Sequence, residues 1–187
     1  MEYLDVVDER DGEPCGEVVA RDVAHERGIC HRTAHVWVVR QAAGTTEVLL
    51  QRRAETKESF PGLFDTSCAG HVTAGDDPRT AAARELSEEL GICAELDALE
   101  FCGTFRIAYE RCFHGREFRD NEVAFVYLLC EEVDEGTLTL QEEEVSEVRW
   151  FALDEVCECV REGRGDFCVP LAGLEVLRRH LSLPHMS

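Results

Sequence analysis

The stretch from Gly70 to Ile92, GHVTAGDDPRTAAARELSEELGI, carries the clearest structural signal in the chain. Asp77 belongs to the residue types that cap the N-terminus of a helix, and Pro78 after it suits the first helical position. Gly91 is of the type that most often follows the last turn. The stretch therefore predicts a helix from about Pro78 to Leu90.

The expected helix has an apolar face and, beside it, an acidic stripe. By the 3.6-residue period, the apolar face contains Ala82, Ala83, Leu86 and Leu90. The stripe contains Glu85, Glu88 and Glu89, and like charges at such spacings cost roughly 0.2–0.5 kcal/mol per pair. Arg84 precedes Glu88 by one helical turn and can offset one of these charges. The stripe is either a solvated surface or a site for a hard divalent cation, and the helix alone favours neither.

The chain is strongly acidic, with 39 acidic and 19 basic side chains among 187 residues and a net charge of -20. Such a surface repels nucleic acids and anionic membranes at long range, so neither is expected as a partner. It also repels phosphates unless a metal ion or a local basic cluster intervenes. The length and the apolar content of 44% are typical of one globular domain, expected to span residues 1–187.

The sequence shows no signal for export or membrane insertion. The N-terminus lacks the basic start and apolar stretch of a secretion signal, and the longest apolar runs are too short to span a bilayer. We therefore expect a cytoplasmic protein. The ten cysteines include no Cys-x-x-Cys pair, and disulfide scaffolds are usually shorter secreted chains, so most of these thiols are expected to be packing residues.

Strand patterns with helices distributed among them predict a layered α/β domain. Strands are expected at Asp5–Asp8, Glu17–Arg21, His31–Gln41, Glu47–Arg53, Phe64–Ala69, Leu99–Ile107, Glu122–Cys130 and Val148–Phe151. Two further helices are expected at Leu153–Arg161 and around Leu171–Leu181. The acidic tract Gln141–Glu144 is expected to be a solvated loop.

The Gly70–Ile92 stretch closely resembles the Nudix box, Gly-x5-Glu-x7-Arg-Glu-U-x-Glu-Glu-x-Gly-U, in which U is aliphatic. Every fixed position matches except Asp76, which stands where the family has Glu. The resemblance implies an α/β/α sandwich with a mixed β-sheet. It also implies hydrolysis of a diphosphate linked to another group, with water and a divalent metal. Because Nudix enzymes often dimerise, a homodimer is one expectation from the resemblance.

The box resemblance also implies roles for its residues. Attack on a diphosphate builds negative charge on phosphorus oxygens, which metal ions neutralise. Glu85, Glu88 and Glu89 are therefore expected to bind Mg²⁺ or Mn²⁺, with one of the three as candidate general base. Arg84 is expected to orient a glutamate through a salt bridge. Asp76 keeps the carboxylate, one methylene shorter, at a position that in the family mainly supports the loop before the helix.

Segments on both sides of the box resemble the branch of the superfamily that contains isopentenyl-diphosphate isomerase and related hydrolases. The matching pieces are Ala24–His25, His31–Trp37, Leu50–Ala54 with Lys57, Phe60–Phe64, Gly70–His71 and Asp120–Val123. The isomerases hold a metal with three histidines and two carboxylates, and the matching residues here are His25, His31, His71, Asp120 and Glu122. Imidazole ligands would favour Mn²⁺, Fe²⁺ or Zn²⁺ at this candidate second metal site. Arg53 and Lys57 match basic residues that grip the diphosphate in that branch.

The segment Asp65–His71, DTSCAGH, distinguishes hydrolase from isomerase. The isomerases have a cysteine directly before Gly-His, where this chain has Ala69, and Cys68 lies one residue earlier. Adjacent side chains of an extended segment point to opposite faces, so Cys68 is expected to face away from the site as a buried small residue. Glu122 matches the second catalytic group of the isomerases, so one of the two groups is missing here, whereas the box carboxylates are complete.

The sequence thus predicts a metal-dependent hydrolase that cleaves a phosphoanhydride bond in an organic diphosphate, either a nucleoside or a prenyl diphosphate. Loops outside the box would set the choice between these substrates. Two alternatives stay open. One is isopentenyl-diphosphate isomerase, and the other is a Nudix domain that binds a ligand without catalysis, against which the intact box carboxylates count.

Overall fold

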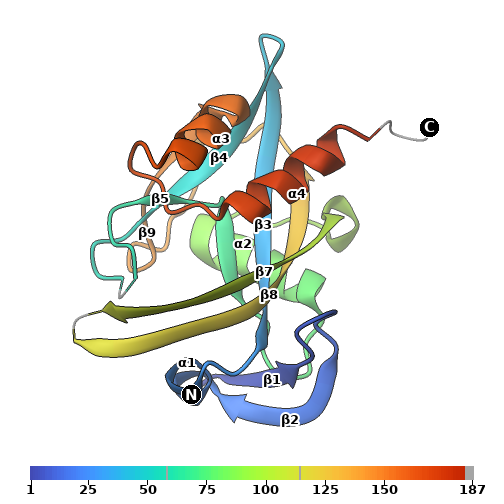
Figure 1. Ribbon diagram of the computed structural model, residues 1–187. Coiled ribbons are helices and arrows are strands. Elements are labelled where there is room, and N and C mark those ends of the chain that lie inside the picture. The colour runs from blue at the N-terminus through green and yellow to red at the C-terminus, as the bar shows by residue number, and fades with distance from the viewer. Residues whose placement is uncertain (58, 114, 184–187) are drawn as a thin grey trace.

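The computed structural model describes residues 1–57, 59–113 and 115–183. Within these ranges, a seven-stranded mixed sheet forms the centre of the molecule (Figure 1). Its strands are β3 (His31–Ala42), β4 (Thr45–Arg53), β5 (Phe64–Asp65), β6 (Cys68–His71), β7 (Glu100–Phe113), β8 (Arg116–Cys130) and β9 (Val145–Ala152). The order is β5-β4-β3-β8-β7, with β6 paired to β3 and β9 to β4. β3 and β8 are parallel, and the other neighbours are antiparallel.

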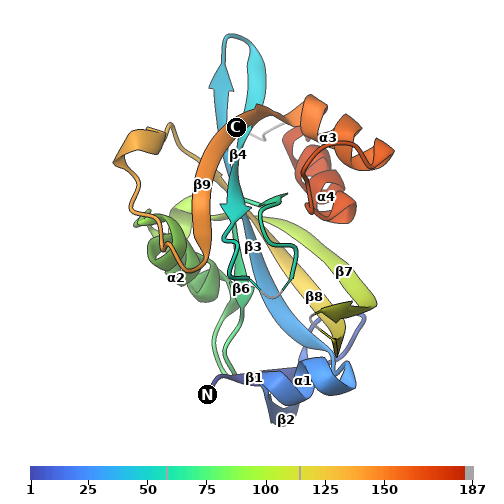
Figure 2. The same cartoon turned by 90° about the vertical axis from the view of Figure 1, so that its left-hand side faces the viewer.

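Helices cover both faces of this sheet, as Figure 2 shows. Helix α2 (Pro78–Leu90) packs on one face, and α3 (Leu153–Glu162) and α4 (Leu171–Leu181) pack on the other. Side chains along β3 alternate between the two cores: Val36 and Val38 are buried with α2, and Trp37 and Val39 are buried with α3 and α4. The predicted α/β/α sandwich with a mixed sheet is therefore confirmed.

The predicted helix over Pro78–Leu90 is also confirmed, with Asp77 accepting hydrogen bonds from the backbone N–H groups of Arg79 and Thr80. Its buried apolar face differs from the expected one in a single alanine. Ala81 is fully buried, whereas Ala83 is only partly buried at the edge of the core. The apolar face is thus rotated slightly toward Ala81.

The N-terminal segment forms a separate two-stranded sheet of β1 (Tyr3–Val7) and β2 (Pro14–Ala20), followed by helix α1 (Arg21–Arg27). Helix α1 was not predicted, because it spans only two turns and Ala20 at its start makes no side-chain cap. Gly28, left-handed with φ of 66° after the last turn, was the available signal. The expected strand through Arg21 is wrong at that residue.

The β7–β8 hairpin is longer than predicted: β7 continues to Phe113, and β8 begins at Arg116. The added length projects beyond the rest of the sheet (Figure 1). Two short 3₁₀ helices, η1 (Leu96–Ala98) and η2 (Glu135–Thr137), complete the elements of the described chain. Among the described residues, no helix is both long and apolar enough to cross a membrane.

Candidate active site

A cavity of about 520 Å³ lies on the sheet face that α3 and α4 cover only in part. Along β3, His35 and Thr33 follow Trp37 on this face and line the cavity where the helices no longer reach. Strand β7 contributes Ile107, Tyr109 and Arg111, and β8 contributes Phe118, Asp120 and Glu122. Helix α1, the loop residues Lys57, Ser59 and Phe60, and the end of α2 bearing the glutamates form further parts of the wall.

Glu85, Glu88 and Glu89, called here the glutamate cluster, reach this cavity from α2. Glu85 lies directly over Gly70 of β6, where a Cβ atom would be 2.2 Å from the Glu85 Cδ atom. Gly70 is therefore required for this close approach of helix and strand. Arg84 Nη1 lies 2.7 Å from Glu85 Oε1 and 3.2 Å from Glu88 Oε2, and its Nη2 donates to the His71 carbonyl.

Glu89 is the buried member of the glutamate cluster, with an exposed fraction of 6%. Its Oε2 accepts a hydrogen bond of 3.0 Å from Gln51 Nε2, just beyond the residues of β4 that pair with β3, where β6 pairs with β3 instead. Burial and the negative charges of Glu85 and Glu144 raise the pKa of Glu89 to about 8. The Glu88 side chain, by contrast, is 55% exposed. The cluster thus grades from a buried carboxylate to a solvated one.

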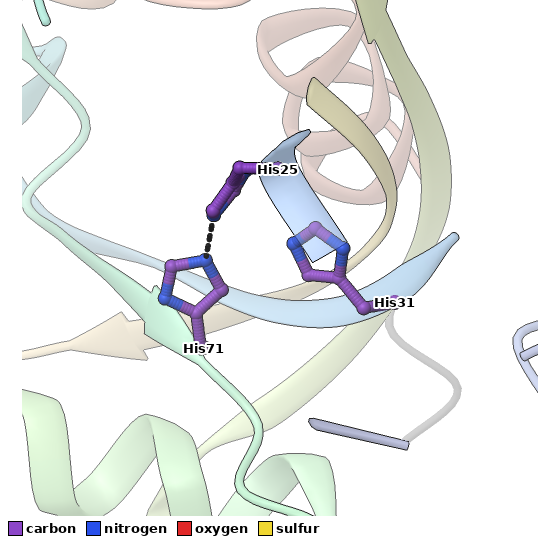
Figure 3. Close-up of side chains that lie close together, drawn as sticks. All are labelled: His25, His31 and His71. Atoms are coloured by element: carbon purple, nitrogen blue, oxygen red, sulfur yellow. Dashed lines mark hydrogen bonds between the residues drawn. The ribbon is translucent and has the colours of Figure 1, made fainter. Parts of the chain in front are cut away.

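The three histidines predicted at a second metal site come together from α1, β3 and β6, as Figure 3 shows. One ring nitrogen from each of His25, His31 and His71 lies within 4.8 Å of the others, and the Nε2 atoms of His25 and His71 are 3.2 Å apart. Burial lowers the pKa of His25 to about 4 and that of His71 to about 3. Neutral imidazoles are the form that binds metals.

Asp120 and Glu122 of β8 complete what we call the histidine–carboxylate cluster, which contains His25, His31, His71, Asp120 and Glu122. His31, Asp120 and Glu122 also offer ligand atoms within 4.8 Å of one another. Thr33 donates to Glu122 Oε2. Burial, and then the charge of Glu122, raise the pKa of Asp120 to about 8. Burial acts against ionisation of Glu122 too, but the neighbouring histidines outweigh it and hold the Glu122 pKa below its ordinary value.

Several buried polar atoms of this cluster have no hydrogen-bond partner within the described chain. They are His25 Nδ1, His31 Nε2 and Asp120 Oδ1. The nearest opposite groups are 3.6 Å away in both pairs, His25 with Asp120 and His31 with Glu122. Orphaned buried atoms that face one another are uncommon in folded proteins and indicate a place for an ion or water.

Arg53 and Lys57, the expected diphosphate contacts, also line the cavity. Both are engaged with protein acceptors. Arg53 lies 3.2 Å from Asp65 and donates to the carbonyl and hydroxyl oxygens of Ser59, and Lys57 pairs with Glu144. The expectation that the acidic tract is solvated throughout is therefore wrong at Glu144, which packs against Lys57 and lines the cavity.

Two supporting residues gave no signal in the sequence. Asp5 of β1 accepts from the Gly75 backbone N–H at 2.9 Å and from Arg32 at 2.7 Å, so it anchors the loop before α2. Asp76 itself contacts this network through its backbone carbonyl, which accepts from Arg32. Gln51, the partner of Glu89, is likewise distant in sequence.

Cys68 faces away from the cavity, as predicted. It is fully buried in the core under α2, opposite Val36, and burial raises the pKa of its thiol. Ala69, opposite His35, faces the cavity instead.

Comparison with known sequences identifies the family. The NUDIX domain family model matches residues 31–168. The chain is 38% identical over 156 residues to Nudix hydrolase 3 of Arabidopsis thaliana, covering 82% of this chain but only 20% of that protein. It is 33% identical over 155 residues to a Nudix hydrolase of Clostridium acetobutylicum, covering 83% of this chain and 72% of that protein.

Solved structures show the same fold. DR0079 from Deinococcus radiodurans superposes with a TM-score of 0.67 at 23% identity, over 95% of this chain and 98% of that one. The NUDIX domain of Shewanella oneidensis NrtR, solved with ADP ribose, gives 0.56 at 17% identity, over 81% and 88%. Nudix hydrolases are pyrophosphohydrolases that generally use divalent metals. The chain belongs to this Nudix hydrolase family.

Proposed function

We propose that this protein is a metal-dependent hydrolase that cleaves a phosphoanhydride bond in an organic diphosphate, nucleoside or prenyl. The observation that carries the proposal is the convergence of Glu85 and Glu89 with Arg53 and Lys57 on one cavity. Carboxylates that could bind cations and basic groups that could bind phosphate therefore line the same cavity. We further propose that residues 1–187 act as one Nudix domain of the isomerase-like branch, and that it forms a homodimer.

Glu85, Glu88 and Glu89 line one cavity but, among the described residues, do not bring three carboxylate oxygens within 4.8 Å of one another, so their side chains would have to move to hold one cation together. Glu89 is buried with its carboxylate near two other negative groups, Glu85 and Glu144, and its hydrogen-bond partner Gln51 is uncharged. The ligand atoms that the glutamate cluster offers to a metal are all carboxylate oxygens, which suit Mg²⁺ or Mn²⁺. Glu85, Glu88 and Glu89 would hold the ion, which when bound neutralises charge on the diphosphate and lowers the pKa of water.

The chain's own groups then have defined tasks in the reaction. Arg84 orients Glu85 and Glu88 through its two ion pairs. A carboxylate of the glutamate cluster takes a proton from the attacking water as the water oxygen bonds to phosphorus. The phosphoanhydride P–O bond breaks, and the two halves of the substrate leave as phosphates. Lys57 and Arg53 lie where the substrate's negative charge would enter.

We also propose that the histidine–carboxylate cluster binds a second metal ion. The support is the set of orphaned buried atoms on His25, His31 and Asp120. Mixed imidazole and carboxylate donors favour Mn²⁺, Fe²⁺ or Zn²⁺.

Isomerase activity is the second candidate, because this same cluster matches the isomerase metal ligands. The position of Cys68 argues against it, since no thiol occupies the Ala69 position on the cavity wall.

The test is turnover of ADP ribose, dimethylallyl diphosphate and isopentenyl diphosphate with Mg²⁺ or Mn²⁺, followed by ³¹P NMR. We expect new phosphate monoesters or free phosphate from at least one compound, and none with a chelator. Double-bond migration in isopentenyl diphosphate without phosphate release would show that the protein is an isomerase.

A further inference from the structure

One side of the cavity is formed by aromatic rings that the proposed hydrolysis does not use. Phe60 comes from the loop of residues 54–63, Tyr109 from β7 and Phe118 from β8. The ring centroids of Phe60 and Tyr109 are 6.2 Å apart, and those of Tyr109 and Phe118 are 6.4 Å apart. The three rings line the same cavity and are called here the aromatic wall; Phe118 also stacks on His25, with ring centroids 4.4 Å apart.

Arg111 extends the aromatic wall with a cation. Its guanidinium carbon lies 5.0 Å from the Phe60 ring centroid and 5.7 Å from that of Tyr109. Arg53, Lys57 and Arg84 on the same cavity all pair with carboxylates, whereas no such pair of Arg111 occurs in the described part of the chain. The planar guanidinium therefore keeps its donors for a ligand beside the rings.

The backbone at Phe60 is held in a conformation that a bulky residue rarely adopts, with φ of 50°. Such conformations are strained and persist where the surroundings enforce them, often at ligand sites. Next to Phe60, the Arg53 guanidinium donates to the carbonyl and hydroxyl oxygens of Ser59 and pairs with Asp65, and the Leu63 N–H donates to the Phe60 carbonyl. These contacts hold the backbone on both sides of Phe60.

We propose that the aromatic wall is the subsite for the nucleobase of a nucleoside diphosphate substrate, with Phe60 as a specificity-determining residue. The inference rests on the proposed function and selects between its two substrate classes. Stacking of a base on aromatic rings and on Arg is favourable in a wet, charged cavity, because it uses the ring faces alone. A prenyl chain would need apolar enclosure, but charged residues form much of the remaining wall, among them Arg21, Arg53, Asp65 and Glu144.

Binding of the fluorescent nucleotide etheno-AMP, measured by anisotropy, tests the aromatic wall without turnover. We expect Phe60→Leu to raise the Kd about tenfold, within the range for one lost base–aromatic stack, and Phe60→Tyr to stay within about threefold of wild type. The matched control is Phe101→Leu, an exposed phenylalanine that packs on Phe125 and Tyr127 outside the cavity and should not change the Kd. Circular dichroism confirms that each variant is folded.

Absence of etheno-AMP binding to the wild type, or equal Kd values for wild type and Phe60→Leu, overturns the inference. So does a Phe60→Tyr variant as weak as Phe60→Leu, because the ring would then not matter. Hydrolysis of ADP ribose, measured on the same proteins, separates the two proposals. If etheno-AMP binding depends on Phe60 but no hydrolysis occurs, the proposed hydrolase function is contradicted and the proposed nucleobase subsite is supported. With hydrolysis, Phe60→Leu should raise KM about tenfold and change kcat less than threefold, as expected for lost uniform binding.

Discussion

The glutamate cluster and the histidine–carboxylate cluster face one cavity from the two sides of β6, yet they are assembled differently. Gly70 of β6 faces Glu85, and the next residue, His71, faces the other way toward His25. The glutamate cluster comes from one helix and is partly solvated. The histidine–carboxylate cluster comes from four elements and is almost fully buried.

The two clusters also differ in how their charged and polar groups are compensated before any cation binds. In the glutamate cluster, Arg84 already compensates two carboxylates, and only Glu89 is left buried without a cation. In the histidine–carboxylate cluster, burial lowers the pKa values of His25 and His71, and several buried atoms lack partners in the described chain. For the two proposed metal sites, we therefore expect an ion that exchanges with substrate at the first and a more permanently bound ion at the second.

The largest effect is expected from Glu89→Gln. The amide keeps the shape and the contact with Gln51 but cannot ionise, bind a cation as an anion or take a proton, so kcat should fall by at least about 10²-fold, the lower end for a lost catalytic carboxylate. Thermal unfolding at neutral pH should be unchanged or shifted upward, since burial raises the pKa of Glu89 and the carboxyl therefore ionises more readily in the unfolded chain. Glu155→Gln on the exposed start of α3 is the matched control. Wild-type turnover by Glu89→Gln would show that the glutamate cluster is not the catalytic one.

The histidine–carboxylate cluster is tested by His71→Asn. Loss of one imidazole should weaken binding of Mn²⁺ or Zn²⁺ by about 10²-fold or more, since even supporting partners of metal ligands are worth 10–100-fold. Metal content after dialysis, measured by mass spectrometry, gives the stoichiometry. His180→Asn on α4 is the control, because its ring pairs with Glu100 away from the cavity. Equal metal content in His71→Asn and wild type would contradict metal binding by the histidine–carboxylate cluster.

Gly70→Ala probes the strand that separates the two clusters. The added methyl would lie 2.2 Å from the Glu85 Cδ atom, so the flexible Glu85 side chain must move while the backbone can stay. We expect kcat to fall by about 10–10²-fold, the scale of a displacement near 1 Å. Metal binding at the histidine–carboxylate cluster should persist. Gly136→Ala, where the added methyl makes ordinary contact with Asp134, is the control. If metal binding at both clusters is lost together, the clusters are coupled and the comparison fails.

The smallest effect is expected from Cys68→Ala. The thiol lies in the α2 core, so the free energy of unfolding should fall by about 1 kcal/mol, as for a deleted methyl-sized group. Turnover should stay within about threefold of wild type. Urea unfolding and steady-state kinetics check both values. A well-folded Cys68→Ala protein that has lost its activity would show that the Cys68 thiol takes part in catalysis, and it would favour the isomerase.

Local spacing determined what the sequence could predict. The cap at Asp77, the period of the Ala and Leu residues and the stop at Gly91 all act within one helix, so they give α2 and the glutamate cluster directly. Alternation along an extended segment likewise places Cys68 in the core and Ala69 at the cavity. These predictions need no knowledge of distant residues, because helix and strand geometry repeat over a few positions.

Tertiary structure alone decided the contacts between segments far apart in the chain. Asp5 anchors the loop at Gly75, Gln51 meets Glu89, and Glu144 leaves its acidic tract to pair with Lys57. Helix α1 was too short to be recognised, so the sequence placed His25 in a candidate site without its supporting element. The aromatic wall depends on how a strained loop meets a hairpin. Such contacts depend on the packing of whole elements, which residue spacing within any one of them does not encode.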